Sequence, residues 1–205
     1  MRKAFVANAS HELRSPLTVV SGYLETLAAD PTIDADLQHP LREMRRQAER
    51  MTDIVNDLLE LSRLESEDGE VSGAPIDVAA LLALLRKDAL SRPLPPSEVR
   101  VSIESDRLII GDETQIHSAF ANLLDNAAKY TPAEGHIELR WWVDEDGGHF
   151  SVSDTGIGIS SEHLPRLTER FYRVDAGRAR ATGGSGLGLA IVKHALQRHG
   201  ARLEI

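Results

Sequence analysis

The chain has 205 residues, no cysteine and a net charge of −9, with 32 acidic against 23 basic side chains. This length fits one or two domains with a hydrophobic core, the acidic balance argues against a nucleic-acid surface, and the lack of cysteine excludes a disulfide framework or a thiolate metal site. No run of about 18 apolar residues occurs, so the sequence predicts no membrane-spanning helix.

An amphipathic helix is predicted over about residues 3–28. Its apolar stripe steps by four and three residues, through Phe5, Ala9, Leu13, Leu17, Val20, Leu24 and Leu27. His11 lies roughly 200° around this helix from Leu13, at about 100° per residue, and is expected to face solvent. Glu12 follows directly, so the pair is either a nucleophile with a base beside it or a solvated surface histidine. The helix is expected to end at Asp30–Pro31.

A second helix is predicted from about residue 37 to Glu65. Its apolar positions alternate steps of three and four, which is a heptad seam, at Leu41, Met44, Ala48, Met51, Val55 and Leu58. Two long helices with a short connection form an antiparallel hairpin, and one hairpin cannot cover two such seams. A dimer that closes a four-helix bundle would cover them. The alternative is a hairpin that packs on the rest of its own chain.

Residues 67–75 are predicted to be a linker, because glycine, proline and acidic residues interrupt both periodicities. The remainder is predicted to be an α+β domain rather than a doubly wound parallel sheet, because its strands and helices do not alternate regularly. Helices are expected at 78–90, 113–129 and 187–199, and strands at 99–103, 107–110, 137–143, 149–153 and 202–205.

Two motifs of this second part carry groups suited to a nucleotide and its metal ion. Asn122 and Asn126 are four residues apart on a predicted helix, so both amides share one face. An amide oxygen suits magnesium, although a polar helix face or a buried hydrogen bond remains open for Asn122. Asp154 follows a strand and could accept a hydrogen bond from an exocyclic amine, as on adenine. Gly156 and Gly158 would let the backbone approach a ligand closely, but this pattern alone is more often a turn.

Two further motifs follow in the chain. Residues 166–175 interleave arginines with aromatic residues, which suits a lid over polyphosphate, although an ordinary surface helix has a similar pattern. Residues 183–190 lead glycines into a helix start, where free backbone N–H groups favour phosphate. This stretch is not a P-loop, since no GK[ST] follows, and not a Rossmann fingerprint, since no strand immediately precedes it.

Taken in order, these motifs resemble the sensor histidine kinases over nearly the whole chain. FVANASHELRSPLTVVSGYLETL looks like the H-box, and NLLDNAAKYTP, DTGIGI, PRLTERFYRVD and GGSGLGLA look like the N, G1, F and G2 boxes. Within the family the phosphate-regulon sensor kinases are most similar. The resemblance implies a dimeric four-helix bundle (1–66), a linker (67–75) and a Bergerat-type (GHKL) α/β sandwich that binds ATP (76–205). The family continues into further strands, so this last domain would be truncated at its C-terminus.

The resemblance also implies roles for individual residues. His11 would accept the phosphoryl group and Glu12 would be its general base. Ser15 stands where relatives with phosphatase activity carry threonine or asparagine. Asn126 would ligate magnesium. The resemblance assigns ATP binding to Asn122, Asn126, Lys129, Tyr130, Asp154, Gly156, Gly158, Arg173, Gly186 and Gly188.

The implied activity is autophosphorylation of His11, with ATP and magnesium, and transfer of the phosphoryl group to an aspartate of a response regulator. A phosphatase activity on that regulator depends on whether Ser15 can orient water. The implied partners are a second copy of the chain and the receiver domain. The implied setting is the cytoplasmic portion of an inner-membrane sensor for phosphate starvation. Two other functions stay open: a Bergerat-type ATPase that drives a clamp, and a catalytically silent dimeric scaffold.

Overall fold

The computed structural model describes residues 2–66, 71, 73–91, 96, 98–174 and 184–205, with only the backbone for residues 2–11. The chain divides into two compact units, one of Met1–Asp68 with Glu169–Ala190 and the other of Gly69–Thr168 with Ile191–Ile205. Within the part of the chain that the structure describes, no helix is long and apolar enough to cross a membrane.

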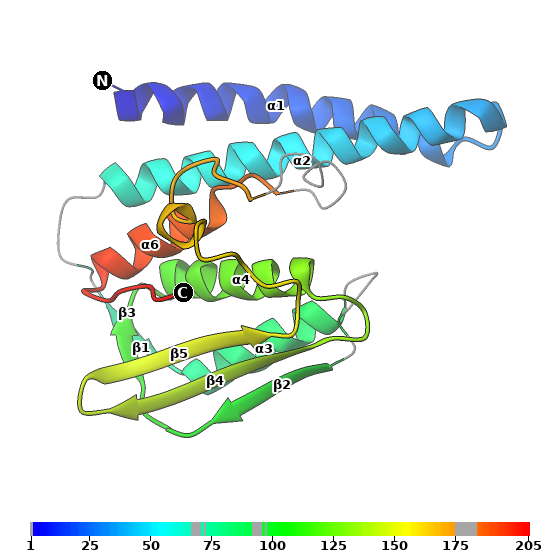
Figure 1. Ribbon diagram of the computed structural model, residues 1–205. Helices are drawn as coiled ribbons and strands as arrows, with labels where there is room; N and C mark the ends of the chain where they lie inside the picture. Colours follow the sequence, from blue (N-terminus) through cyan, green and yellow to red (C-terminus); the bar gives the residue numbers. More distant parts are fainter. Residues whose placement is uncertain (1, 67–70, 72, 92–95, 97, 175–183) are drawn as a thin grey trace. The chain divides into compact units, whose positions relative to one another are not determined.

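The first unit contains the predicted helical hairpin. Helix α1 (Arg2–Ala29) and helix α2 (Ala35–Ser66) run antiparallel along each other (Figure 1). In the turn, the Asp30 carboxylate accepts hydrogen bonds from the backbone N–H and the hydroxyl of Thr32 at 2.8 and 2.7 Å. Asp34 accepts from the Asp36 N–H at 3.1 Å, as an N-cap side chain does. Both helix predictions are confirmed within two residues.

Apolar residues of the hairpin fall into two sets. One set is buried between the two helices, and it consists of Leu17, Leu24, Leu41, Ala48, Val55 and Leu59. The other set is about half exposed and recurs every seven residues on each helix, at Leu13, Val20 and Leu27 and at Leu37, Met44 and Met51. The hairpin therefore uses only half of each predicted seam for itself. Phe5 and Ala9 lie outside the described side chains.

The second unit is built on a three-stranded mixed sheet in the order β2-β4-β5. Strand β2 (Glu98–Ile103) pairs parallel with β4 (His136–Asp144), and β4 pairs antiparallel with β5 (Gly147–Asp154) through a hairpin. A separate antiparallel pair joins β1 (Ala74–Ile76) to β3 (Ile109–Gly111). The mixed sheet confirms the α+β prediction.

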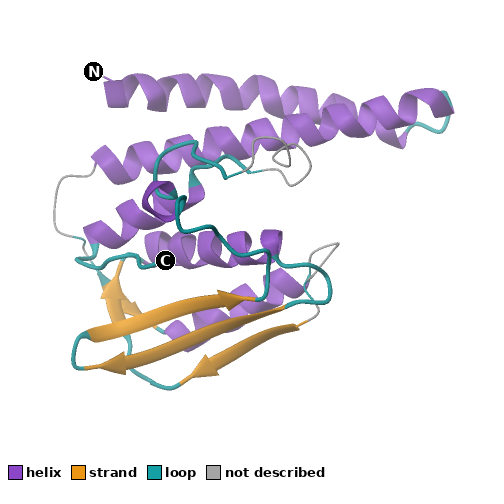
Figure 2. Cartoon of the chain, viewed as in Figure 1, coloured by secondary structure: helices purple, strands orange, loops and turns teal. Residues whose placement is uncertain are grey.

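One face of the sheet is covered by helices (Figure 2). Helices α3 (Val78–Leu90) and α4 (Glu113–Tyr130) pack on this face, over the inward-facing strand residues Val99, Ile137, Leu139 and Trp141, which are at most 2% exposed. Each helix begins at an aspartate N-cap whose carboxylate accepts a backbone N–H, at 3.0 Å in α3 and 3.1 Å in α4. Helix α6 (Gly188–Arg198) follows the glycine-rich stretch, and a short 3-10 turn, η1, spans Leu164–Arg166.

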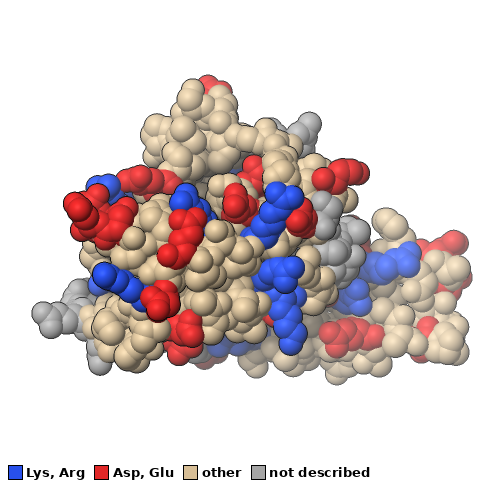
Figure 3. Space-filling model, turned by 90° about the horizontal axis from the view of Figure 1, so that it is seen from below, with Lys and Arg blue, Asp and Glu red and all other residues tan. Residues whose placement is uncertain are grey.

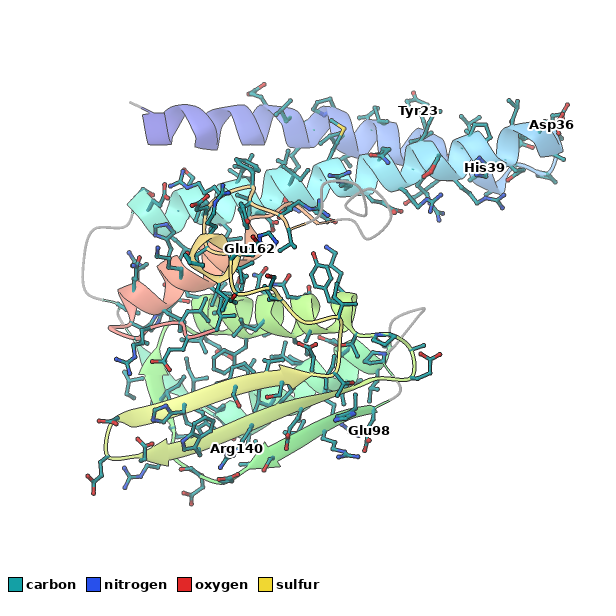
Figure 4. The ribbon with its side chains drawn as sticks, in the orientation of Figure 1. Tyr23, Asp36, His39, Glu98, Arg140 and Glu162 are labelled. Carbon is teal, nitrogen blue, oxygen red and sulfur yellow. The ribbon has the colours of Figure 1, made fainter. Side chains whose placement is uncertain are left out.

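The other face of the sheet carries polar side chains at alternate positions. Arg140 projects from β4 on this face (Figure 4), where it binds Glu104 at 2.6 and 2.9 Å and lies 4.7 Å from the Trp142 ring. Trp142 in turn stacks on His149 of β5. Acidic and basic side chains intermingle in the view from below (Figure 3), which does not resemble a nucleic-acid surface.

Two predictions about strands need correction. Residues 74 and 75, assigned to the linker, belong to β1, a strand too short for its alternation to be recognised. The strand expected over Arg202–Ile205 is absent, and residues 201–205 have no regular structure. A strand needs a hydrogen-bonded partner, and none of the strand pairs among the described residues includes this segment. Its alternating sequence alone could not supply one.

Candidate active site

The phosphoacceptor candidate lies on a continuous helix. The backbone at His11 is helical, while its side chain lies outside the described residues, so its direction stays a prediction. Glu12 and Ser15 are both exposed on α1. Arg14 donates from Nη2 to Oδ1 of Asn56 on α2 at 2.9 Å. Asn56 was not singled out in the sequence, because an exposed asparagine in a heptad carries no distinguishing pattern.

Helix α4 holds the two candidate amides one turn apart, and both are half-buried. Asn122 donates from Nδ2 to the Ser118 carbonyl at 2.9 Å and to the Ser118 hydroxyl at 3.3 Å, so its nitrogen is engaged within its own helix and its oxygen is left for a ligand. Within the described residues, no hydrogen bond engages the side chain of Asn126. An amide oxygen without a partner suits magnesium, which takes one or two protein ligands beside water and substrate phosphates. The residues present therefore fit the ion.

The end of α4 meets the end of β5 at a close backbone contact. The Ile157 N–H donates to the Tyr130 carbonyl at 3.3 Å. The Gly156 N–H donates to Oδ1 of Asp154 at 2.8 Å. A Cβ at position 156 would lie 2.4 Å from the Tyr130 oxygen and 2.6 Å from that carboxylate oxygen, so only glycine fits. The structure thus brings Tyr130, Asp154 and Gly156 together.

This arrangement fits recognition of a nucleobase amine. One carboxylate oxygen of Asp154 orients its own loop, and the second oxygen remains an acceptor. Gly158 has a φ of +69°, a conformation that favours glycine. Tyr130 is 41% exposed at the same helix end. Lys129, next to it on α4, is half-buried.

Two threonines near this contact, Thr155 and Thr131, received no role in the sequence analysis. The Thr155 hydroxyl accepts a hydrogen bond from the His136 N–H at 3.0 Å, which ties the end of β5 to the start of β4. Thr131, one residue beyond Tyr130, is buried, and its hydroxyl has no hydrogen-bond partner among the described residues. In the sequence, only its position between Lys129-Tyr130 and Pro132 pointed to Thr131.

The candidate residues of the lid and the glycine-rich stretch belong to the other unit, where two contacts tie them together. The Phe171 N–H donates to the Gly186 carbonyl at 2.8 Å, and Arg173 donates from Nη1 to the Gly184 carbonyl at 2.6 Å. Gly186 has a φ of +73°, and a Cβ there would lie 2.9 Å from the Phe171 Cα. Arg173 therefore braces the glycine-rich stretch, a role that the predicted lid cation did not include.

Gly188 is the first residue of α6, where backbone N–H groups are open to a phosphate. The Ser185 hydroxyl accepts from the Leu187 N–H at 3.0 Å just before the helix. The predicted helix start is confirmed within one residue. Gly183 and residues 175–182 lie outside the described residues.

Known proteins are similar to the chain over its whole length. The model of the His Kinase A (phospho-acceptor) domain matches residues 1–67, and that of the histidine kinase-, DNA gyrase B- and HSP90-like ATPase matches residues 111–205. The phosphate regulon sensor protein PhoR of Pseudomonas aeruginosa is 54% identical over 208 residues, which cover 100% of this chain and 47% of that protein. The chain spans about half the length of the curated relatives it matches.

Solved structures extend the similarity to the fold. The crystal structure of full-length ShkA in complex with AMPPNP has a TM-score of 0.74 at 29% identity, and the alignment covers 96% of this chain and 41% of that one. The mycobacterial sensor histidine kinase MprB is 30% identical with a TM-score of 0.51, over 62% of this chain and 80% of that one.

Proposed function

This chain belongs to the sensor histidine kinase family, and from that premise we propose that it transfers the γ-phosphoryl group of ATP to His11. It then donates the group to an aspartate of a response-regulator receiver domain. The observation that carries the proposal is the contact of Tyr130, Asp154 and Gly156 in a chain that also carries a histidine on a helical hairpin. The contact leaves one carboxylate oxygen for the adenine amine, beside a helix whose Asn126 oxygen is without a partner among the described residues.

Phosphoryl transfer needs mainly the correct positioning of the reactants and the stabilisation of negative charge. An imidazole with an ordinary pKa of about 6.5 is mostly neutral at physiological pH and can attack phosphorus. In the proposed step a ring nitrogen of His11 bonds to the γ-phosphorus, and ADP leaves with the electrons of the broken P–O bond. Glu12 takes the proton from the other ring nitrogen. Magnesium, when bound through Asn126 and the phosphates, supplies charge neutralisation. Asn122, through its amide oxygen, and Lys129, through its positive charge, would help to bind the ATP phosphates beside the ion.

The second transfer restores the histidine. A carboxylate oxygen of the receiver aspartate bonds to phosphorus as the N–P bond breaks, the ring nitrogen keeps the electron pair, and Glu12 returns its proton to the imidazole. We propose that Ser15, exposed one turn beyond His11, faces the receiver. Its hydroxyl would orient water if the chain also acts as a phosphatase on the phosphorylated regulator.

The proposed working form is a homodimer. Half-exposed apolar residues recur every seven residues on both helices, and a second hairpin would cover them in a four-helix bundle. We further propose domains at 1–66 and 76–205, with the second extended to residue 74 by β1. The protein's setting is the cytoplasmic portion of an inner-membrane sensor, and the PhoR similarity supports a task in phosphate-starvation signalling.

Incubation with ATP labelled at the γ-phosphorus tests the proposal against its alternatives. A histidine kinase retains acid-labile, base-stable label on the protein. A Bergerat-type ATPase releases free phosphate without labelling the protein, and a silent scaffold does neither. Either of these two results would reject the proposed function. Asp154→Asn is the matched control, because it should suppress the label while leaving the hairpin intact.

A further inference from the structure

A hydrogen bond joins the two helices of the hairpin close to the phosphoacceptor position. Arg14 of α1 donates to Asn56 of α2 at 2.9 Å. Leu17, three residues after Arg14, packs in one buried cluster with Val55, which immediately precedes Asn56, and with Leu59. This cluster fixes the register of the two helices at that level. The hydrogen bond itself is exposed, but the buried cluster fixes the backbone positions that carry its two ends.

The partner of Arg14 is a neutral amide, whereas six other arginines among the described residues pair with carboxylates. Carboxylates pair with Arg45, Arg46, Arg100, Arg140, Arg170 and Arg202. No such ion pair engages Arg14 among the residues that the structure describes. A guanidinium is always charged and has five N–H donors, of which Asn56 engages one. Asn56 therefore fixes the position of the cation without neutralising it.

His11 precedes Arg14 by three residues on α1, and positions three apart are neighbours on a helix surface. We propose that Asn56 is a positioning residue that holds the uncompensated charge of Arg14 beside the phosphoryl group as this group is transferred to His11. The inference rests on the proposed function, because it gives Arg14 a task in that same reaction.

The charge balance of the step explains the need for a cation. The neutral imidazole gains a phosphoryl group with negative oxygens, while its proton leaves to Glu12 and ADP departs with the electron pair. Negative charge thus accumulates at a helix surface that carried none on the imidazole. A cation already in place stabilises the group in transfer without reorganising at that moment. Asn56 holds the Arg14 guanidinium in this position before the transfer begins.

Two replacements of Asn56 separate position from charge. Asn56→Ala removes the contact, whereas Asn56→Asp keeps an acceptor oxygen in place but neutralises the guanidinium. We expect Asn56→Asp to slow initial labelling by γ-labelled ATP about tenfold, less than the 10²–10³ lost with a buried donor, because Arg14 is partly solvated. The KM for magnesium-ATP should stay unchanged. Asn56→Ala should fall between Asn56→Asp and the wild type.

Matched variants control for surface charge and for stability. Gln47→Glu adds the same charge at an exposed position of α2 outside this contact and should label at the wild-type rate. Arg14→Ala should be as slow as Asn56→Asp, and the double variant should be no slower, because no charge is left to neutralise. Thermal unfolding checks the fold. If the contact between Arg14 and Asn56 were only structural, Asn56→Asp would be as stable as the wild type and would also label at the wild-type rate.

Wild-type labelling by Asn56→Asp would overturn the inference, as would a further tenfold loss when that change is added to Arg14→Ala. Failure of the proposed function has a different signature. In that case the unaltered chain acquires no acid-labile label, or the label persists in His11→Ala, and the inference falls with it.

Discussion

At Gly156 the backbone runs so close to Tyr130 that a side chain has no room. A methyl group there would meet the Tyr130 carbonyl oxygen at 2.4 Å, and that oxygen belongs to backbone and cannot swing away. Gly156→Ala should therefore displace the loop after β5 and weaken ATP binding at least about tenfold, which is 1.4 kcal/mol. Gly22→Ala is the control, because nothing lies within 4 Å of a Cβ there. Equal ATP affinity of the two variants in calorimetry would contradict the site.

Asp154 offers a second test at the same scale, with the opposite structural consequence. Asparagine keeps an oxygen that can accept the Gly156 N–H, so the fold and the loop should survive Asp154→Asn. The second oxygen becomes an NH₂ donor that faces the adenine amine, so ATP should bind at least about tenfold more weakly. Thermal unfolding and calorimetry measure the two effects separately. An unchanged ATP affinity would exclude Asp154 from adenine recognition.

Helices α1 and α2 were predictable from the heptad steps, but which residues of each seam are buried inside the hairpin was not. A period of seven identifies an apolar stripe, and it does not say which members face the partner helix of the same chain. The structure buries Leu17, Leu24 and Val55 inside the hairpin and leaves Leu13, Met44 and Met51 about half exposed. The sequence predicted that a second copy would cover both seams, and the structure narrows the surface open to that copy to their exposed members.

The dimer can be tested on that exposed set. Met51→Glu places a charge where a second hairpin would pack, so it should shift the full chain from dimer to monomer. Because Met51 is half exposed in the single chain, the fold itself should tolerate the change. His39→Glu, which adds the same charge at an exposed position on the polar side of α2, should remain dimeric. Sedimentation at micromolar concentration distinguishes them. A Met51→Glu dimer of wild-type strength would contradict this seam.

On the outer face of the sheet, Glu104 and Arg140 form a pair with a defined pH dependence. The hydrogen bond from Arg140 holds the pKa of Glu104 below its ordinary value. The pair therefore stabilises the fold above the ordinary glutamate pKa, and its contribution is lost as the pH falls through the lower folded value. Glu104→Gln should unfold at a slightly lower temperature at neutral pH, with the difference vanishing in acid. A difference that persists in strong acid would contradict this assignment.

Over the whole molecule, the order of the motifs and most helices and strands could be predicted from the sequence, but features that depend on pairing between distant segments could not. Strand β1 escaped because three residues show no alternation, and Arg202–Ile205 was predicted as a strand although no ladder partner exists for it among the described residues. The hydrogen bonds from Arg14 to Asn56 and from Arg173 to Gly184 join residues that are not neighbours in the sequence, so no local pattern predicts them. The exposure of Tyr23, which projects from α1 away from α2 (Figure 4), was likewise visible only in three dimensions.

The central claim is that one chain both binds ATP and carries the phosphoryl group on His11. Tandem mass spectrometry of the protein after incubation with magnesium-ATP, with acid avoided during digestion, tests it most directly. The claim predicts a phosphoryl group on the peptide that contains His11, and none in His11→Gln, which should still bind ATP with wild-type affinity. A phosphoryl group on another residue, or the same degree of phosphorylation in His11→Gln, would contradict it.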